Sequence, residues 1–199
     1  MAGVPKSMNR SQMAIASSIA IVFILIFSTL RLNLSGNPMP PRIIEEKEFS
    51  LIGIAARTNN AKEMTDAGVI PAQWNRLFSE GVLARIPNKV DTNIYAVYTD
   101  YASDRNGDYT YFLGAKVSDG STVPSSMVMK TVPAGKYSVV TSARGPVQKV
   151  VPLAWRQVWT LDDNSQLGGA RSYKADFEIY DQRSRDPRDS QVDLYIGIK

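Results

Sequence analysis

The side chains best suited to chemistry lie on two β-rich runs near the end of the chain. Residues 174–180 (KADFEIY) and 192–198 (VDLYIGI) alternate apolar and polar side chains, as strands with one buried face do. The polar side chains are Asp176, Glu178 and Tyr180 in the first run and Asp193 and Tyr195 in the second. We expect them to share one face, which, if concave, would receive a flat cationic or polar aromatic ligand. The alternative is an ordinary solvated sheet face.

Aromatic side chains could form the walls of such a site. Trp155 and Trp159 lie four residues apart, so a helix would place them on one face, where they either line a cleft or pack into a core. Trp74 has the same two interpretations. The predicted strands also carry Tyr95, Tyr98, Tyr109 and Tyr111. Because aromatic residues suit strands for structural reasons too, these tyrosines are compatible with a ligand cleft without requiring one.

The composition excludes several classes of active site. The 199 residues include no Cys and no His, which removes thiol nucleophiles, imidazole bases, disulfides and Cys/His metal sites. The sequence has neither a glycine-rich phosphate loop nor a nucleophile elbow. We therefore expect no metal and no cofactor.

The formal charge of +4 belongs to the N-terminal end. Residues 1–42 contain Lys6, Arg10, Arg31 and Arg42 and no acid, so the rest of the chain is net neutral. A neutral domain lacks the basic surface that is typical of nucleic-acid binding. We therefore expect no direct contact between the domain and nucleic acid.

The N-terminal region is predicted to attach the chain to a membrane. Residues 1–12 are short and basic, and residues 13–30 (MAIASSIAIVFILIFSTL) are uncharged and nearly long enough to span a bilayer as a helix. The alternative is a cleaved signal peptide. Residues 31–44 contain Gly, Asn and Pro and are predicted to be a non-helical linker. The basic residues ahead of the apolar segment favour an internal N-terminus and an extracytoplasmic domain.

The remaining chain repeats one order of elements, namely strand, helix, strand, strand. In the first half these elements are predicted at residues 48–56, 71–81, 93–101 and 109–117. In the second half they are predicted at residues 127–132 with 136–141, 150–161, 173–180 and 192–198. Pro71 suits the start of a helix and Gly81 its end, while Gly145 and Pro146 stop the strand before the second helix. The repeat predicts an α+β domain over residues 45–199, in which two β-α-β-β units form one antiparallel-rich sheet with both helices on one face.

These segments resemble the GyrI-like small-molecule-binding family, also known as the bacterial transcription-activator effector-binding domain. The resemblance rests on VPAGKYSVVTSARGP, on a helix with two tryptophans, and on DFEIYDQRS followed by SQVDLYIGIK. It covers about residues 45–199. It implies a duplicated β-α-β-β fold with a ligand cleft between the halves, and a buried acid that meets cationic or aromatic ligands.

The resemblance also implies roles for particular residues. By motif position, Glu178 is the implied acid and Asp193 the second choice, while Tyr137, Trp155 and Tyr195 are implied for the cleft wall. Some family members are similar to hydrolases that open reactive cyclopropane-bearing toxins, and there such an acid would assist a water, because a desolvated carboxylate can act as acid or base. Many relatives carry a helix-turn-helix region at the N-terminus. This chain has residues 1–42 there instead, so direct transcriptional control is not expected.

We therefore expect a membrane-anchored binding protein rather than an enzyme. It would capture small cationic or aromatic organic molecules in an acidic, aromatic-lined cleft, and its other partner would be the lipid bilayer, through residues 13–30. The first alternative is a hydrolase of reactive xenobiotics that uses Glu178 or Asp193. The second is a regulatory protein-interaction module that resembles a gyrase inhibitor.

Overall fold

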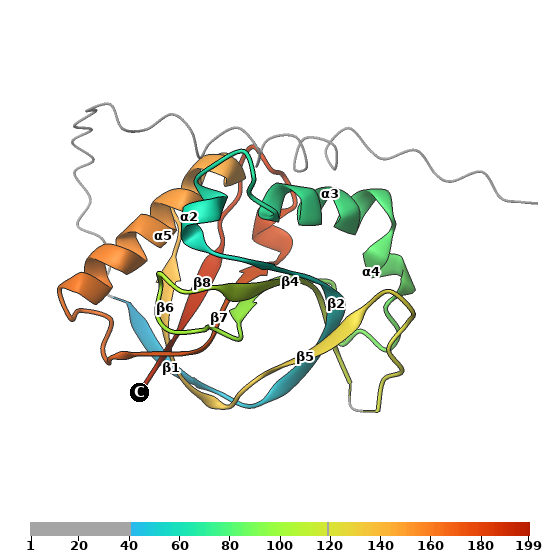
Figure 1. The fold of residues 1–199 in the computed structure, drawn as a ribbon, viewed down its shortest axis with the longest axis horizontal. Coiled ribbons are helices and arrows are strands. Elements are labelled where there is room, and N and C mark those ends of the chain that lie inside the picture. Colours follow the sequence, from blue (N-terminus) through green and yellow to red (C-terminus); the bar gives the residue numbers. More distant parts are fainter. Residues whose placement is uncertain (1–40, 119) are drawn as a thin grey trace, which may run out of the picture.

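The computed structural model describes residues 41–118 and 120–199, which form a curved antiparallel sheet with helices on one side (Figure 1). The strands are β1 (Arg42–Glu46), β2 (Phe49–Thr58), β3 (Ile94–Thr99), β4 (Tyr109–Val117), β5 (Val128–Val132), β6 (Gly135–Thr141), β7 (Arg171–Tyr180) and β8 (Asp193–Ile198). The helices are α2 (Asn60–Glu63), α3 (Ile70–Ser79), α4 (Val82–Arg85) and α5 (Val147–Asp163), followed by a 3-10 turn at Gln182–Ser184. The prediction of an antiparallel-rich α+β domain is confirmed.

The order of the strands reveals a duplication in which the two halves exchange their first strands. The order is β1-β6-β8-β7-β3-β4-β2-β5, so β7 and β3 meet at the centre and equivalent strands follow on each side. β1 of the first half pairs with β6 of the second, and β5 of the second half pairs with β2 of the first. Each half therefore contributes an edge strand to the other, which ties the two halves into one sheet.

The first half contains a strand that the sequence pattern did not predict. β1 begins at Arg42, inside the segment 31–44 that was predicted as a linker. Ile43 and Ile44 lie opposite Ser138 and Tyr137 of β6. These two branched residues follow a proline-rich stretch, and their strand is too short and too exposed for its alternation to be recognised without its partner.

Local sequence explains where the helices begin and end. Pro71 occupies the first turn of α3, where its missing N–H is not needed. Gly81 follows α3 with a φ of 59°, in the left-handed region that glycine adopts without strain. α5 begins directly after Pro146 and extends further at both ends than the predicted residues 150–161. It continues through Pro152, although this residue removes one helical hydrogen bond.

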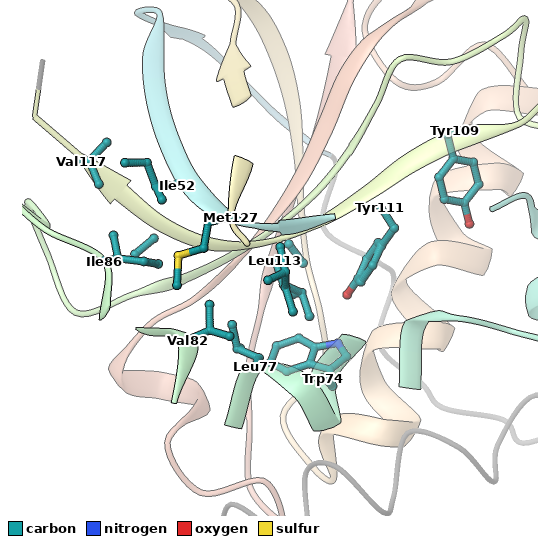
Figure 2. Packing of buried hydrophobic residues seen from close by; sticks show 13 residues of the cluster. Ile52, Trp74, Leu77, Val82, Ile86, Tyr109, Tyr111, Leu113, Val117 and Met127 are labelled. Carbon is teal, nitrogen blue, oxygen red and sulfur yellow. The ribbon is translucent and has the colours of Figure 1, made fainter. Parts of the chain in front are cut away.

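The helices bury one face of the sheet. Trp74 and Leu77 of α3 and Val82 of α4 pack against Ile52 of β2 and Leu113 of β4 (Figure 2). α5 packs in the same way over β6 and β8. Each fully buried side chain of this size contributes about 1.5–3 kcal/mol relative to an exposed one, so the packing fixes the helices firmly on this face of the sheet.

A second core lies on the other face, where the outer strands curl away from the helices (Figure 1). It includes Phe49, Phe112 and Phe177, whose side chains are nearly or fully buried. Gly53 of β2 lies opposite Gly114 of β4, and a Cβ atom on Gly53 would come within 2.0 Å of the carbonyl oxygen of Leu113. The close approach of these two strands therefore requires glycine. Because side chains pack on both sides of the sheet, its inner strands are buried on both faces.

The predicted membrane segment at residues 13–30 and the basic residues 1–12 lie outside the described residues. Within residues 41–118 and 120–199, no helix is both long and apolar enough to cross a membrane. Membrane attachment thus remains a prediction from the sequence.

Candidate functional site

A cavity of about 440 Å³ lies on the helix side of the sheet, between α5, α3 and the central strands. Both halves of the duplication line it. The first half contributes Trp74, Tyr98 and Tyr111, and the second contributes Trp155, Glu178 and Tyr180. A cavity of this size can hold a drug-sized organic molecule.

Glu178 lies at the floor of this cavity, on β7. Its side chain is almost fully buried, and its carboxylate accepts hydrogen bonds from three neutral donors. The indole N–H of Trp155 donates to Oε1 at 2.5 Å, the hydroxyl of Tyr98 donates to the same oxygen at 2.8 Å, and the hydroxyl of Tyr180 donates to Oε2 at 2.7 Å. No Lys or Arg of the described residues forms an ion pair with it.

Burial and hydrogen bonding act in opposite directions on Glu178. Desolvation raises the pKa of its carboxyl above 4.5, and the donors Trp155, Tyr180 and Tyr98 offset part of that rise. Burial also raises the pKa values of Tyr98 and Tyr180, so both hydroxyls stay protonated and donate. When ionised, this carboxylate has no counter-charge in contact with it among residues 41–118 and 120–199.

The walls around Glu178 are aromatic. The ring of Tyr98 packs edge-on against Trp155 at 4.8 Å and against Tyr111 at 5.2 Å between centroids. Trp74 packs edge-on against Tyr180 at 4.9 Å. These rings hold each other in place and present both edges and faces to the cavity, which suits a ligand with apolar or aromatic groups.

A second buried acid, Asp176, lies two residues before Glu178 and has a different environment. The guanidinium of Arg171 forms an ion pair with it, the hydroxyl of Tyr101 donates to Oδ2 at 2.7 Å, and the amide of Gly197 donates to Oδ1 at 2.9 Å. Arg171 is itself buried and packs over the ring of Tyr173. Asp176 is therefore neutralised within the fold, whereas Glu178 is not.

The structure places three of the predicted site residues away from the cavity. Asp193 accepts hydrogen bonds from the Thr141 hydroxyl at 2.6 Å and from Arg183 at 2.8 Å, so it holds the loop that precedes β8. Tyr195 stacks on Phe177 at 4.4 Å. Tyr137 also packs on Phe177, and its hydroxyl bonds to a backbone carbonyl. Of the five predicted residues, Glu178 and Trp155 line the cavity together.

The register between β7 and β8 explains this separation. Residues directly opposite each other in an antiparallel pair project to the same face. Glu178 lies opposite Leu194, whereas Phe177 lies opposite Tyr195. The acid-bearing positions of β8 thus share a face with the apolar positions of β7, and the expectation that the two strands present their acids together is wrong.

Sequence reasoning did not connect Tyr98 and Tyr111 with Glu178, although both were noted as strand tyrosines. Tyr98 reaches Glu178 because β3 is the neighbour of β7 in the sheet, with Ala96 directly opposite Glu178. Tyr111 lies opposite Tyr98 on the next strand. The pairing between β3 and β7, the equivalent strands of the two halves, would have been needed to find them.

Two curated relatives share most of this chain. YobU of Bacillus subtilis (strain 168), a transcriptional regulator by name, is 34% identical over 157 residues, which cover 78% of this chain and 94% of YobU. The transcriptional regulator BrlR of Pseudomonas aeruginosa is 32% identical over 166 residues, or 80% of this chain. The chain spans only 56% of BrlR, so the similarity covers about half of that protein.

Two solved structures share the fold. The integron cassette protein VCH_CASS2 from the mobile metagenome of Vibrio cholerae superposes with a TM-score of 0.64 and 26% identity, covering 81% of this chain and 97% of that one. SAV2435, solved bound to tetraphenylphosphonium, has a TM-score of 0.62 and 17% identity, covering 81% of this chain and 94% of that one.

The relatives correct one expectation and confirm another. The expectation that nucleic acid is no partner is overturned, because both curated relatives are transcriptional regulators by name. The neutral net charge of residues 43–199 was a poor guide, because a net charge does not describe how charges are distributed over a surface. The expected kinship with effector-binding domains is confirmed: residues 42–198 match the family described as integron-associated effector binding protein, and the chain belongs to that family.

Proposed function

We propose that this domain binds organic cations with aromatic or apolar substituents, and that Glu178 is their ionic partner. The observation that carries the proposal is a buried carboxylate with three neutral donors and no ion pair among the described residues, at the floor of an aromatic cavity. An uncompensated buried charge is costly. An entering cation supplies the missing charge, and the surrounding rings add about 0.5–2 kcal/mol for each good cation–π contact.

The environment of Glu178 favours binding over hydrolysis. An ionised carboxylate offers about four acceptor positions, and three are already taken by Trp155, Tyr98 and Tyr180. A general base must also hold the attacking water within hydrogen-bond reach, which leaves one position for that task. The same three bonds favour the ionised form against the effect of burial and fix the carboxylate in place, as charge recognition requires.

The test is a calorimetric titration of the full-length chain with tetraphenylphosphonium, the aromatic cation present in the SAV2435 structure. Replacing the carboxylate in Glu178→Gln removes a charge interaction of about 3 kcal/mol, for a separation of about 5 Å at an effective dielectric constant of about 20. We expect the Kd to rise about 150-fold. Asp193→Asn is the control, because Asp193 lies on the other face of the sheet. Equal affinities of wild type and Glu178→Gln would refute the proposal.

We further propose that ligand binding serves transcriptional control. The support is that YobU, which this chain matches over 94% of its length, and BrlR are transcriptional regulators by name. Comparing genome-wide transcript levels in cells with and without the gene, with tetraphenylphosphonium added or omitted, tests this role. Ligand-dependent changes that persist in the Glu178→Gln strain would count against it.

The cellular location is a separate proposal that rests on the sequence alone. Residues 13–30 are uncharged over a length close to that of a membrane span. We propose that they retain the domain at a membrane. Carbonate extraction of membranes followed by detection of the chain tests this, and recovery of the full-length chain in the supernatant would contradict it.

A further inference from the structure

Among the described residues, three arginines and one acid line the cavity, and most of this charge is already paired. Arg171 is paired with Asp176, and its other nitrogen lies 4.0 Å from Asp162. Arg105 is paired with Asp163 at 2.8 Å. These two guanidinium groups therefore have partners within the fold and offer little net charge to a ligand.

Arg156 differs from the other two arginines. It lines the cavity from α5, its side chain is exposed, and it forms neither an ion pair nor a side-chain hydrogen bond with any described residue. Glu178 is the lining acid without an ion pair among the same residues. The cavity thus has two uncompensated charges of opposite sign, one buried at the floor and one exposed at the rim.

We propose that the ligand of this cavity is zwitterionic: its cationic aromatic part reaches Glu178, and an anionic group such as a carboxylate remains at the rim beside Arg156. This inference rests on the proposed function and names the class of ligand within it. The guanidinium is the side chain best suited to a carboxylate, because its parallel N–H donors match the two oxygens.

The geometry of α5 sets the spacing between the two charges. Trp155 points inward, with its indole on Glu178, and Arg156 is the next residue, about 100° further around the helix. Two side chains in this relation end about 8 Å apart, given the width of a helix with its side chains. The anionic and cationic groups of the ligand should therefore be separated by a chain of about five carbon atoms.

The test compares two probes of equal shape on the full-length chain. (5-Carboxypentyl)triphenylphosphonium is a zwitterion at neutral pH, and its methyl ester is a plain cation. We expect wild type to bind the acid about fivefold more tightly than the ester at low salt, with a smaller preference at high salt because the rim is exposed. Arg156→Gln should bind acid and ester equally, while Arg156→Lys should retain part of the preference. Lys149→Gln is the matched control, because Lys149 is an exposed cation of the same helix that does not line the cavity.

Glu178→Gln separates this inference from the proposed function. It should weaken binding of the acid and the ester by the same factor and leave their ratio unchanged. Equal binding of the two probes by wild type, or an equal loss for both in Arg156→Gln, would overturn the zwitterion while the cation site stands. If neither probe binds wild type, both the inference and the proposed function are refuted.

Discussion

Binding of a permanent cation should depend on pH through Glu178. Burial raises the pKa of this carboxyl above 4.5, so protons and the cation compete for it within a range that is easily reached. Above that pKa the carboxylate is ionised and binding is strong. As the pH falls through the pKa, affinity is lost.

The size of the effect follows from the geometry. A charge interaction of about 3 kcal/mol corresponds to a loss of about 150-fold in affinity. Below the pKa, the Kd of a single-site competitor rises about tenfold for each pH unit until this plateau is reached. The wild-type curve should then meet that of Glu178→Gln, which should itself stay flat.

The composition makes this experiment unusually direct. The chain contains no His and no Cys, and tetraphenylphosphonium carries no titratable group, so the usual sources of a pH response near neutrality are absent. Hydrogen bonds from Arg and Lys side chains outweigh burial, which alone would raise the pKa, in four other acids, and so lower their pKa values: Glu80, Asp100, Asp181 and Asp186. Calorimetric titrations between pH 4 and pH 8 provide the measurement. A flat wild-type curve, or a slope that persists in Glu178→Gln, would refute the reasoning.

Three further predictions concern stability and fine tuning of the site. The pKa of Glu178 is higher in the folded than in the unfolded chain, so the ligand-free wild type should lose stability relative to Glu178→Gln as the pH rises from the unfolded pKa through the folded one. The loss should be about 1.4 kcal/mol for each pH unit that separates the two pKa values. Urea unfolding at several pH values measures this, and a constant difference between the two proteins would contradict it. Trp155→Phe removes the indole donor to Glu178 and keeps the apolar wall, so it should lower the free energy of unfolding by about 1.5–3 kcal/mol when the carboxylate is ionised. Because the lost bond favours the ionised form, the midpoint of affinity against pH should also move to higher pH; an unmoved midpoint would show that this bond is unimportant. Gly53→Ala should destabilise the fold by about 2 kcal/mol or more in urea unfolding, because its Cβ would meet the backbone of β4, whereas Gly135→Ala, whose Cβ would contact nothing within 4 Å, should be nearly neutral; similar effects of the two would refute the role assigned to the glycine pair.

Features encoded over a few residues could be predicted from the sequence. The period of the strands, Pro71 at the start of α3 and Gly81 after its end depend on neighbours in the chain, and the structure agrees with each. The family resemblance implied a buried acid at Glu178, and the structure buries that side chain. β1 was not predicted, because this edge strand of five residues forms by pairing with β6, which lies about 90 residues away in the sequence.

The site was only partly predictable because strand alternation gives two faces without saying which faces of two strands coincide. Asp193 and Glu178 each lie on a polar face of their own strand, but a pairing that sets Glu178 opposite Leu194 turns them to opposite sides. A shift of one residue in register would have brought them together. The contact between Tyr98 and Glu178 could not be predicted either, since it depends on the pairing of β3 with β7 at the centre of the sheet.

Both halves of the duplicated fold contribute aromatic walls to the cavity, but only the second half contributes an acid, Glu178, among the described residues that line it. At the centre of the sheet, Ala96 lies opposite Glu178 and Tyr98 opposite Asp176, so the first half places neutral residues where the second places acids. The aromatic rings of both halves set the size and shape of the ligand. In the function that we propose, its charge and orientation are set by Glu178 on one strand and Arg156 on one helix, both of which line the cavity. That proposal predicts that a change of ligand class requires changes at these two positions and leaves the packing that holds the halves together intact.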